Sequence, residues 1–391
     1  MIVLDEAQTL PVPLLRPSLA ALEDLAGNYG ASVVLCTATQ PAWRRSDEAL
    51  PAPPLAALDI PAERELAPDP PRLYAALRRV RVEPPAEPIE DATIAERFAA
   101  QPQMLCIVNS RRHARDLFDR IAAQPGAAHL TTLMCPAHRR VVLARCRAAL
   151  EAGAPVRLVA TSLIEAGVDI DFPEVWRAVT GLDSIAQAAG RCNRNGNLPS
   201  GRVVVFEPAD AKPPRDLRLF WQAARPALRA HADPLSLEAV RHYFRELYFV
   251  RGPAGLDAAR RDGQVWPIMP AIAERAREAA FPFAAIAEAY RLIDDPAKPV
   301  IVPWDKTAKA VLDRIAAMDR PSSPDLRRLQ RYVVTLPRRA RDDWLAAGVL
   351  RPVHPALGDA LLRFEDLAHY RDATGVDLRD PSYRAAEENI L

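Results

Sequence analysis

Residues 104–122 read MLCIVNSRRHARDLFDRIA, which is an apolar run, a polar turn and a helical pattern in succession. Met104 to Val108 is uninterrupted and apolar, which is typical of a buried strand in a parallel sheet. Asn109 and Ser110 form the turn, and Arg111 to Ala122 has the spacing of a helix. The stretch therefore predicts one strand–turn–helix unit of an α/β fold.

Further units of this kind lie on both sides of the stretch. The apolar patterns predict strands at 2–4, 32–36, 156–161, 175–179 and 202–206, and helices at 17–26, 138–150 and 184–192. Strands that alternate with helices predict a parallel sheet with helices on both faces. Beyond about Asp210 the alternation ends, and helical patterns such as 235–248 and 271–280 dominate. The stretch 327–341 reads as a strand followed by a basic turn.

The chain divides by pattern into three parts. Residues 1–70 hold two strands and one helix, a partial α/β lobe, and the proline-rich stretch 51–71 reads as a loop or linker. Residues 71–210 hold a complete α/β lobe with a parallel sheet. Residues 211–391 are predicted to be a mainly helical accessory domain.

Composition sets broad limits on the class of protein. The chain has 391 residues, of which 49% are hydrophobic and 26% are charged, as in ordinary globular proteins. No apolar run approaches the roughly 18 residues that a membrane span needs. The five cysteines lack CxxC spacing, which argues against a zinc site and fits reduced thiols in a cytoplasm. A net charge of +1 argues neither for nor against binding to nucleic acid. An exposed arginine is usually part of a solvated surface.

Asp5 and Glu6 stand directly after the first predicted strand. Function in α/β folds gathers at the C-terminal ends of strands. ATP hydrolysis needs one carboxylate to hold Mg²⁺ and a second to orient or deprotonate the attacking water, and an adjacent pair supplies both. A solvated acidic turn is the ordinary alternative for such a pair taken alone.

Thr37 and Thr39 stand at the end of the next predicted strand, about 30 residues later, which is a usual spacing for one βαβ unit. Their hydroxyls could hydrogen-bond the preceding acidic loop and so couple a phosphate site to a nucleic-acid site. A threonine-rich turn is the alternative.

Residues 161–171, TSLIEAGVDID, are more specific. Thr161 and Ser162 are hydroxyls at a strand end that could bind a nucleic-acid phosphate. Gly167 permits close approach of the backbone to a ligand, and Asp169 could accept a hydrogen bond from a ribose hydroxyl.

Residues 187–194, QAAGRCNR, carry the strongest chemical signal. Arg191 and Arg194 are three residues apart, so on a helix they would share one face. Guanidinium groups suit triphosphate oxygens and stabilise transition-state charge, and Gln187 could position water or a γ-phosphate oxygen. The alternative is a basic helix end followed by an Asn-Gly turn.

The order of these motifs matters more than any one of them. DExQ, TAT, TSxxEAGxDID and QxxGRxxR, in this order and spacing, resemble motifs II, III, V and VI of superfamily-2 helicases. Three stretches resemble the CRISPR-associated helicase–nuclease of type I systems more closely: VNSRRHA at 108–114, LMCPAHRR at 133–140 and SIAQAAGRCNR at 184–194. The resemblance covers residues 1–210 and is weak beyond them.

The resemblance implies two RecA-like lobes, partial in 1–70 and complete in 71–210. Such lobes clamp ATP between them and ratchet a single strand as they close and open. It further implies ATP and Mg²⁺ as cofactors, single-stranded DNA as substrate, an RNA-guided surveillance complex as partner and antiviral defence as the role.

The resemblance also assigns roles to the residues already singled out. Asp5 and Glu6 would hold Mg²⁺ and water, and Thr37 and Thr39 would couple the two sites. The residues expected at the nucleotide are Gly167, Asp169, Gln187, Arg191 and Arg194. Those expected on the DNA backbone are Asn109, Ser110, Arg111, Thr161 and Ser162.

Two parts of the family pattern do not occur in this sequence. The phosphate-binding loop GxxxxGK[ST] should precede DExQ, but no lysine precedes Lys212. The family's nuclease needs a His-Asp dipeptide, and no histidine here is followed by aspartate. We therefore expect that the chain begins inside the first lobe, that the remaining helicase and nuclease portion is a partner, and that a genomic read upstream shows the GK[ST] loop.

Two other functions remain open. One is a different superfamily-2 motor, against which the VNSRRHA stretch argues. The other is a non-catalytic module that grips single strands or docks on a partner.

From the sequence we predict that the purified chain hydrolyses ATP negligibly, because it has the arginine side of the site but lacks the phosphate-binding loop. A phosphate-release assay with and without single-stranded DNA checks this expectation. DNA-stimulated turnover by the chain alone would refute it.

Overall fold

The computed structural model describes residues 1–47, 58, 60–292 and 297–378. Packing groups the chain into two compact units, each built from stretches that are far apart in sequence. The first unit holds Met1–Glu87, Val179–Glu207 and Pro213–Asp294, and the second holds Pro88–Ala178, Pro208–Lys212 and Asp295–Leu391. Because this grouping does not follow the order of the chain, the predicted domain limits at 70 and 210 stay predictions. Residues 51–57 and 59 of the predicted proline-rich linker lie outside the described residues.

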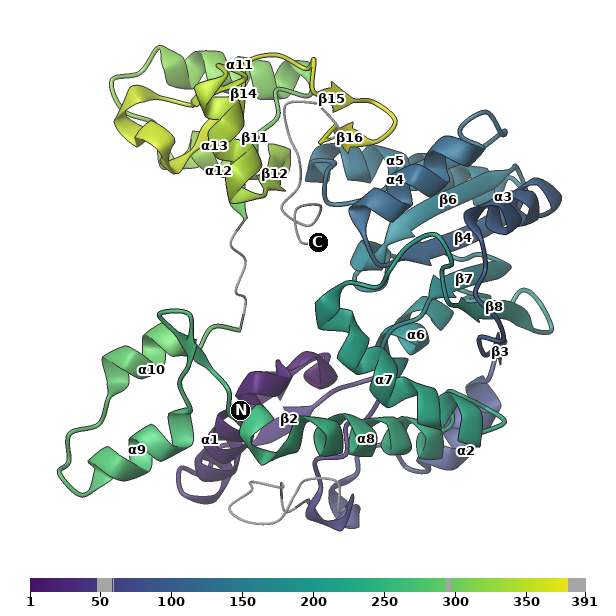
Figure 1. The fold of residues 1–391 in the computed structure, drawn as a ribbon, viewed down its shortest axis with the longest axis vertical. Coiled ribbons are helices and arrows are strands. Elements are labelled where there is room, and N and C mark those ends of the chain that lie inside the picture. Colours follow the sequence, from purple (N-terminus) through teal and green to yellow (C-terminus); the bar gives the residue numbers. More distant parts are fainter. Residues whose placement is uncertain (48–57, 59, 293–296, 379–391) are drawn as a thin grey trace. The chain divides into compact units, whose positions relative to one another are not determined.

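A six-stranded sheet occupies the middle of the chain, in the order β3-β8-β7-β4-β6-β5 (Figure 1). Its strands are β3 (Val80–Glu83), β4 (Gln103–Val108), β5 (Ala127–Leu130), β6 (Val156–Thr161), β7 (Glu174–Ala178) and β8 (Gly201–Phe206). The predicted parallel sheet is confirmed, and its central strand β4 explains the uninterrupted apolar run. Every side chain from Met104 to Val108 is 0% exposed, as expected for a strand covered on both faces.

Helices flank the sheet in Figure 1. They are α3 (Asp91–Ala100), α4 (Arg111–Ile121), α5 (Pro136–Glu151) and α6 (Leu182–Ala189). The helices predicted at 111–122 and 138–150 are confirmed within two residues at each end. The sequence pattern missed α3, β3 and β5, which are short and carry charged or polar residues between their apolar ones.

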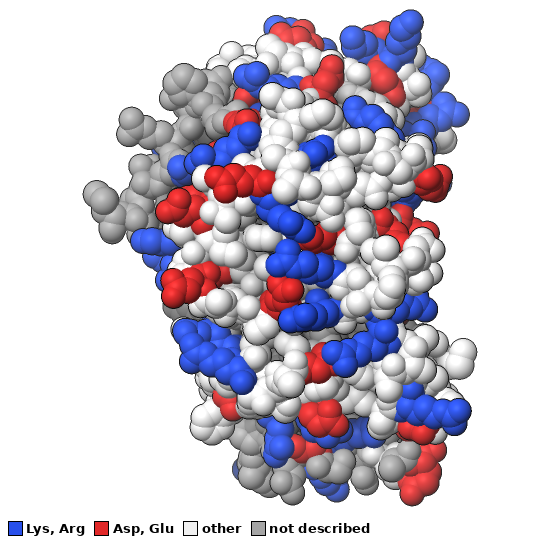
Figure 2. All heavy atoms as spheres, turned by 90° about the vertical axis from the view of Figure 1, so that its right-hand side faces the viewer, with Lys and Arg blue, Asp and Glu red and all other residues white. Residues whose placement is uncertain are grey.

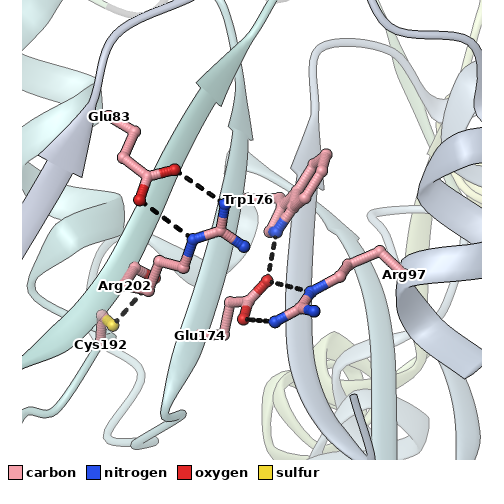
Figure 3. A network of polar contacts seen from close by, with 6 residues as sticks. All are labelled: Glu83, Arg97, Glu174, Trp176, Cys192 and Arg202. Carbon is pink, nitrogen blue, oxygen red and sulfur yellow. Dashed lines mark hydrogen bonds and ion pairs between the residues drawn. The ribbon is translucent and has the colours of Figure 1, made fainter. Parts of the chain in front are cut away.

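Two glutamates of the sheet, Glu174 and Glu83, are each paired with an arginine. In β7, the carboxylate of Glu174 accepts hydrogen bonds from Arg97 Nε at 2.8 Å and from the indole Nε1 of Trp176 at 2.6 Å. Figure 3 shows the guanidinium of Arg97 reaching this carboxylate. A buried carboxylate needs such donors, because leaving it unpaired costs several kcal/mol.

A second pair joins β3 to β8 in the same way (Figure 3). The guanidinium of Arg202 donates to both carboxylate oxygens of Glu83, through Nε at 3.1 Å and Nη2 at 2.8 Å. Cys192 donates its thiol to the backbone carbonyl of Arg202 at 3.4 Å. The Glu83–Arg202 ion pair holds β3 against β8. The sequence pattern did not predict β3 as a strand of this sheet.

The N-terminal stretch forms β1 (Ile2–Leu4), α1 (Leu15–Gly27) and β2 (Val33–Leu35), as predicted. β1 pairs with β2 in parallel, with Ile2 opposite Val33 and Leu4 opposite Leu35. The two strands form a two-stranded sheet among the residues that the structure describes.

The helical region predicted after residue 210 is also confirmed. Its helices are α7 (Arg215–Ala230), α8 (Leu237–Gly255), α9 (Ile268–Ala276) and α10 (Phe283–Ala289), with a small hairpin of β9 (Arg260–Arg261) and β10 (Gln264–Val265) between α8 and α9. Helix α2 (Pro70–Leu77) precedes β3.

Residues 298–364 add a four-stranded sheet that the sequence did not predict, in the order β12-β11-β14-β13. Its elements are β11 (Lys298–Ile301), α11 (Lys306–Ala316), α12 (Ser323–Leu329), β12 (Val333–Leu336), α13 (Arg338–Ala346), β13 (Leu350–Pro352) and β14 (Leu362–Phe364). The predicted strand inside 327–341 exists as β12. The basic stretch after it is a helix rather than a turn, because Ala340 and Trp344 bury one side of α13.

A terminal hairpin, β15 (Tyr370–Arg371) and β16 (Gly375–Val376), packs against the segment before α5. The amide of Val376 donates to the carbonyl of Leu133 at 2.9 Å. Gly375 has φ +75°, and a Cβ there would lie 2.2 Å from the Leu133 carbonyl oxygen. Only glycine fits both this backbone conformation and this close approach.

Surface properties agree with the composition. Figure 2 shows Lys and Arg interspersed with Asp and Glu on the face in view, without a region of one sign. No helix in the described part of the chain has the length and apolar character required for crossing a membrane.

Strand β5 buries a histidine whose protonation should make the fold acid-sensitive. His129 is 1% exposed, and burial, together with the positive charges of Arg115 and His138, lowers its pKa to about 3. The unfolded chain takes up a proton as the pH falls below about 6.5, whereas the folded chain does not until about pH 3. The free energy of unfolding is therefore unaffected by the titration of His129 above pH 6.5, and it falls by about 1.4 kcal/mol per pH unit as the pH drops from about 6.5 towards 3.

We predict that His129→Leu makes the stability less dependent on pH between about 4.5 and 6.5. Urea unfolding of both proteins across this range measures the effect. An equally steep loss of stability in the variant would show that other groups cause it.

Candidate functional site

The acidic pair lies directly after β1, and Glu6 has an unusual backbone. Its φ and ψ are 50° and 45°, a left-handed conformation that costs a non-glycine residue roughly 1–2 kcal/mol. The loop is held by neighbouring contacts, since Ala7 N donates to the carbonyl of Cys36 at 3.0 Å and Thr9 N donates to that of Glu6 at 2.9 Å. The Asp5 carboxylate accepts from Glu6 N at 3.0 Å. Strain of this kind is often maintained at functional sites.

Side-chain hydrogen bonds link the acidic pair to the threonines after β2. Gln8 donates its amide to Glu6 Oε2 at 2.5 Å, and the Thr37 hydroxyl donates to the amide oxygen of Gln8. The predicted bond between a threonine hydroxyl and the acidic loop is therefore present at Thr37. Thr39 takes another position: its side chain is 3% exposed, and its hydroxyl has no hydrogen-bond partner among the described residues.

Helix α6 reaches the same acidic loop from far along the chain. Gln187 Nε2 donates to Glu6 Oε2 at 3.4 Å, across 181 positions of sequence. One carboxylate oxygen thus accepts from both Gln8 and Gln187. The first compact unit therefore brings together three of the predicted site motifs: the acidic pair, Thr37 and Gln187.

The prediction that Arg191 and Arg194 share a helix face is wrong. Helix α6 ends at Ala189, and tight turns follow. Asn193 has φ 46°, and its amide nitrogen donates to the carbonyls of Arg79 at 2.9 Å and Leu198 at 2.8 Å. These contacts fix a turn where the helix would have continued. The two arginines therefore have different surroundings: Arg191 is 8% exposed, whereas Arg194 lies at the surface.

The motif at 161–171 lies in the second compact unit. Thr161 ends β6 and is buried, whereas Ser162 is exposed at the start of the 3-10 turn Ser162–Ile164. Gly167 has φ +67°, and a Cβ there would meet nothing within 4 Å, so the backbone conformation accounts for the glycine. The Asp169 side chain is exposed, and its carbonyl accepts from Arg147 Nε at 2.6 Å.

The turn after β4 lies at the same sheet edge as the end of β6. Val108 pairs with Thr161, so the residues that follow each strand emerge side by side. Ser110 caps α4 by accepting from His113 N at 3.1 Å, and Arg111 is the half-buried first residue of that helix. Asn109 Oδ1 accepts from Arg177 at 2.6 Å.

Two tyrosines of α8, which the sequence did not single out, support the first unit's site. Tyr243 donates its hydroxyl to Asp183 Oδ1 at 2.9 Å, and Asp183 lies one turn before Gln187 on α6. Burial, the charge of Asp183 and this hydrogen bond raise the pKa of Tyr243 well above its usual value, so the hydroxyl stays a donor. Tyr248 accepts from the indole of Trp43 at 2.7 Å. A local pattern could not reveal these contacts, because their partners are 60 and 205 residues away.

A cavity of about 210 Å³ lies between α8 and the turns that follow the acidic pair. Its lining is mostly apolar and aromatic and includes Gln8, Leu10, Phe220 and Tyr243. It therefore adjoins the acidic loop without offering it a further charged ligand beyond Asp183.

The acidic pair suits Mg²⁺ by its chemistry. Two carboxylates are hard oxygen ligands, and Mg²⁺ usually keeps several waters while using one or two carboxylates and substrate phosphates. No group of three or more metal-ligating side chains occurs among the residues that were placed. Asp5 and Glu6 would hold such a metal, with water and substrate phosphate as its further ligands.

Comparison with known proteins finds relatives of this chain. Residues 100–197 match the family described as "CRISPR-associated nuclease/helicase Cas3, C-terminal". The CRISPR-associated nuclease/helicase Cas3 of Haloferax volcanii is 50% identical over 58 residues, which are 14% of this chain and 6% of that protein. These findings confirm the family resemblance inferred from the motifs.

Solved structures resemble this chain over most of its length. A crystal structure of T. fusca Cas3 with ADP has a TM-score of 0.59 at 16% identity, covering 93% of this chain and 50% of that one. A structure titled as an RNA-guided CRISPR surveillance complex before nicking has a TM-score of 0.53 at 15% identity, covering 97% and 55%. At these identities the likeness shows the fold, and the chain spans about half the length of these structures.

We predict that Tyr243→Phe loosens α6, because it leaves the Asp183 carboxylate without this donor, and that it destabilises the fold by about 1–3 kcal/mol. Hydrogen exchange of the α6 amides measures the local effect. Tyr248→Phe is the matched control, since it should loosen the Trp43 segment and leave α6 protected. Equal exchange of α6 in both variants would contradict the assignment.

Proposed function

We propose that the chain is part of a Cas3-type CRISPR-associated nuclease/helicase, which the family match over residues 100–197 supports, and that it forms part of an ATP-dependent motor on single-stranded DNA. In this proposal the first unit contributes the acidic and arginine sides of a nucleotide site. The second unit contributes loops that grip the DNA backbone.

The contact between Gln187 and Glu6, at 3.4 Å, is the observation that carries the proposal. It joins the loop suited to a metal and water to the helix that precedes two arginines. Asp5 and Glu6 would hold Mg²⁺ and orient the attacking water, while Gln187, Arg191 and Arg194 would bind the triphosphate. Similar T. fusca Cas3 structures were determined with ADP and with ATP, which supports a nucleotide at this site.

Thr37 would couple nucleotide state to DNA grip through its bond to Gln8. Gly167 and Asp169 remain proposed nucleotide neighbours, and Thr39 remains a proposed coupling residue. The proposed DNA contacts are Asn109, Ser110, Arg111, Thr161 and Ser162, which lie at one edge of the sheet. Phosphate contacts of this kind give a grip that is independent of sequence.

The proposed partner is an RNA-guided surveillance complex, since one similar structure is that of a CRISPR RNA-guided surveillance complex. The proposed setting is the cytoplasm, where CRISPR defence would act on invading DNA. A non-catalytic DNA-binding or partner-binding module is the second candidate. It requires only the loops that follow β4 and β6, which lie at one edge of the sheet.

We predict that the chain binds a fluorescent oligothymidylate and that its affinity falls as salt rises. Arg111→Ala should reduce the slope of log affinity against log salt by about one, because one phosphate contact is lost. Arg120→Ala, an exposed arginine in the last turn of the same helix, should leave the slope unchanged. Fluorescence anisotropy across a salt series provides both values.

The same samples test whether this chain acts as a motor by itself. DNA binding with ATP turnover would support a motor within this chain, and DNA binding without turnover would support the binder or a motor that needs a further segment. Failure to bind the oligonucleotide at low salt would overturn the proposed DNA-binding role.

A further inference from the structure

Strand β7 places an arginine in the interior of the sheet. Arg177 is 1% exposed and lies between Trp176 and Ala178, opposite Ile107 of β4. Arginine is almost never fully buried unless it is paired. Its partners should therefore explain why it is there.

The guanidinium of Arg177 contacts both loops that are proposed to grip DNA. Its Nη1 donates to Asn109 Oδ1 at 2.6 Å and to its neighbour's carbonyl, Ala178 O, at 2.9 Å. Its Nε lies 2.8 Å from Glu165 Oε1, and both side chains are at most 5% exposed. Asn109 follows β4, and Glu165 follows the 3-10 turn after β6.

Stability alone is a weak reason for this arrangement. Removing two charges from water opposes their attraction, and buried ion pairs are often replaceable by apolar residues without loss of stability. A planar guanidinium with several donors, in contrast, fixes the relative geometry of the groups that it joins. The contact set thus specifies the position of Asn109 relative to Glu165.

We propose that Arg177 is a positioning residue that holds the Asn109 loop and the Ser162–Glu165 loop at the spacing needed to contact one DNA strand. The inference rests on the proposed DNA-binding function and deepens it. Arg177 itself does not contact phosphate, because it is buried and the carboxylate of Glu165 lies beside its charge. Its effect on DNA is transmitted through Asn109 and the segment that begins at Ser162.

The test separates positioning from stability by removing both charges together. Arg177→Met alone leaves Glu165 buried without this partner and should lower the melting temperature markedly. The double variant Arg177→Met, Glu165→Met should recover most of that loss and still bind oligothymidylate about tenfold more weakly. The magnitude of its salt slope should fall by about one, since a phosphate contact is misplaced.

Arg157→Met is the matched control. Arg157 is another buried arginine of this sheet, but it lies near the start of β6 and donates to the carbonyls of Phe98 at 2.5 Å and Pro125 at 2.6 Å. It should lower the melting temperature and leave the salt slope of the folded protein unchanged.

Arg177→Lys provides a second variant if the double variant does not fold. It keeps the positive charge near Glu165 but lacks the fork that reaches Asn109, so weaker binding and a smaller salt slope are expected. A folded double variant or lysine variant with the parent's affinity and slope would overturn the inference while the proposed function stands. A parent chain that does not bind the oligonucleotide would overturn both.

Discussion

The carboxylate of Glu6 is the junction on which the first unit's site depends. It accepts hydrogen bonds from Gln8, two residues away, and from Gln187, which lies 181 residues away. The left-handed backbone of Glu6 orients this side chain, and contacts to the strand end at Cys36 hold the loop in place. A ligand that binds this carboxylate would therefore alter the hydrogen bonds that link it to Thr37, through Gln8, and to helix α6.

Helix α8 supports this junction from outside the motifs. Its two buried tyrosines form hydrogen bonds with Asp183 on α6 and with Trp43 beyond the threonine turn, so one helix carries contacts to both sides of the site. A hydrogen bond requires a short distance and good alignment, so each of these contacts sets one specific geometry. The same reasoning applies at the sheet edge of the second unit, where Arg177 joins two loops.

The elements that could be predicted are those whose burial or helix cap is evident from neighbouring residues in the sequence. β4 is an unbroken apolar run because both of its faces are covered, and α4 has a serine cap followed by a helical pattern. β5 escaped prediction because it has four residues, one of them a histidine that only its tertiary neighbours keep neutral. The strands β11, β13 and β14 were not predicted for a similar reason, since each has only three or four residues, and a proline in β11 and another in β13 weaken the pattern further.

The sequence alone indicated the resemblance to a family, the parallel sheet and the types of residue in the candidate site, because motif order, apolar runs and side-chain chemistry can all be read along the chain. The tertiary structure alone decided which of these residues meet. In the structure Gln187 donates to Glu6, and Thr39 takes no part in the hydrogen bonds that link Thr37, Gln8 and Glu6. Arg191 and Arg194 lie beyond the end of α6 and do not share a helix face. It also recruited Tyr243 and Arg177, which no motif contains. The physical reason is that hydrogen bonds and ion pairs depend on distances of about 3 Å between groups that are many positions apart in the sequence, and only packing of the chain sets those distances.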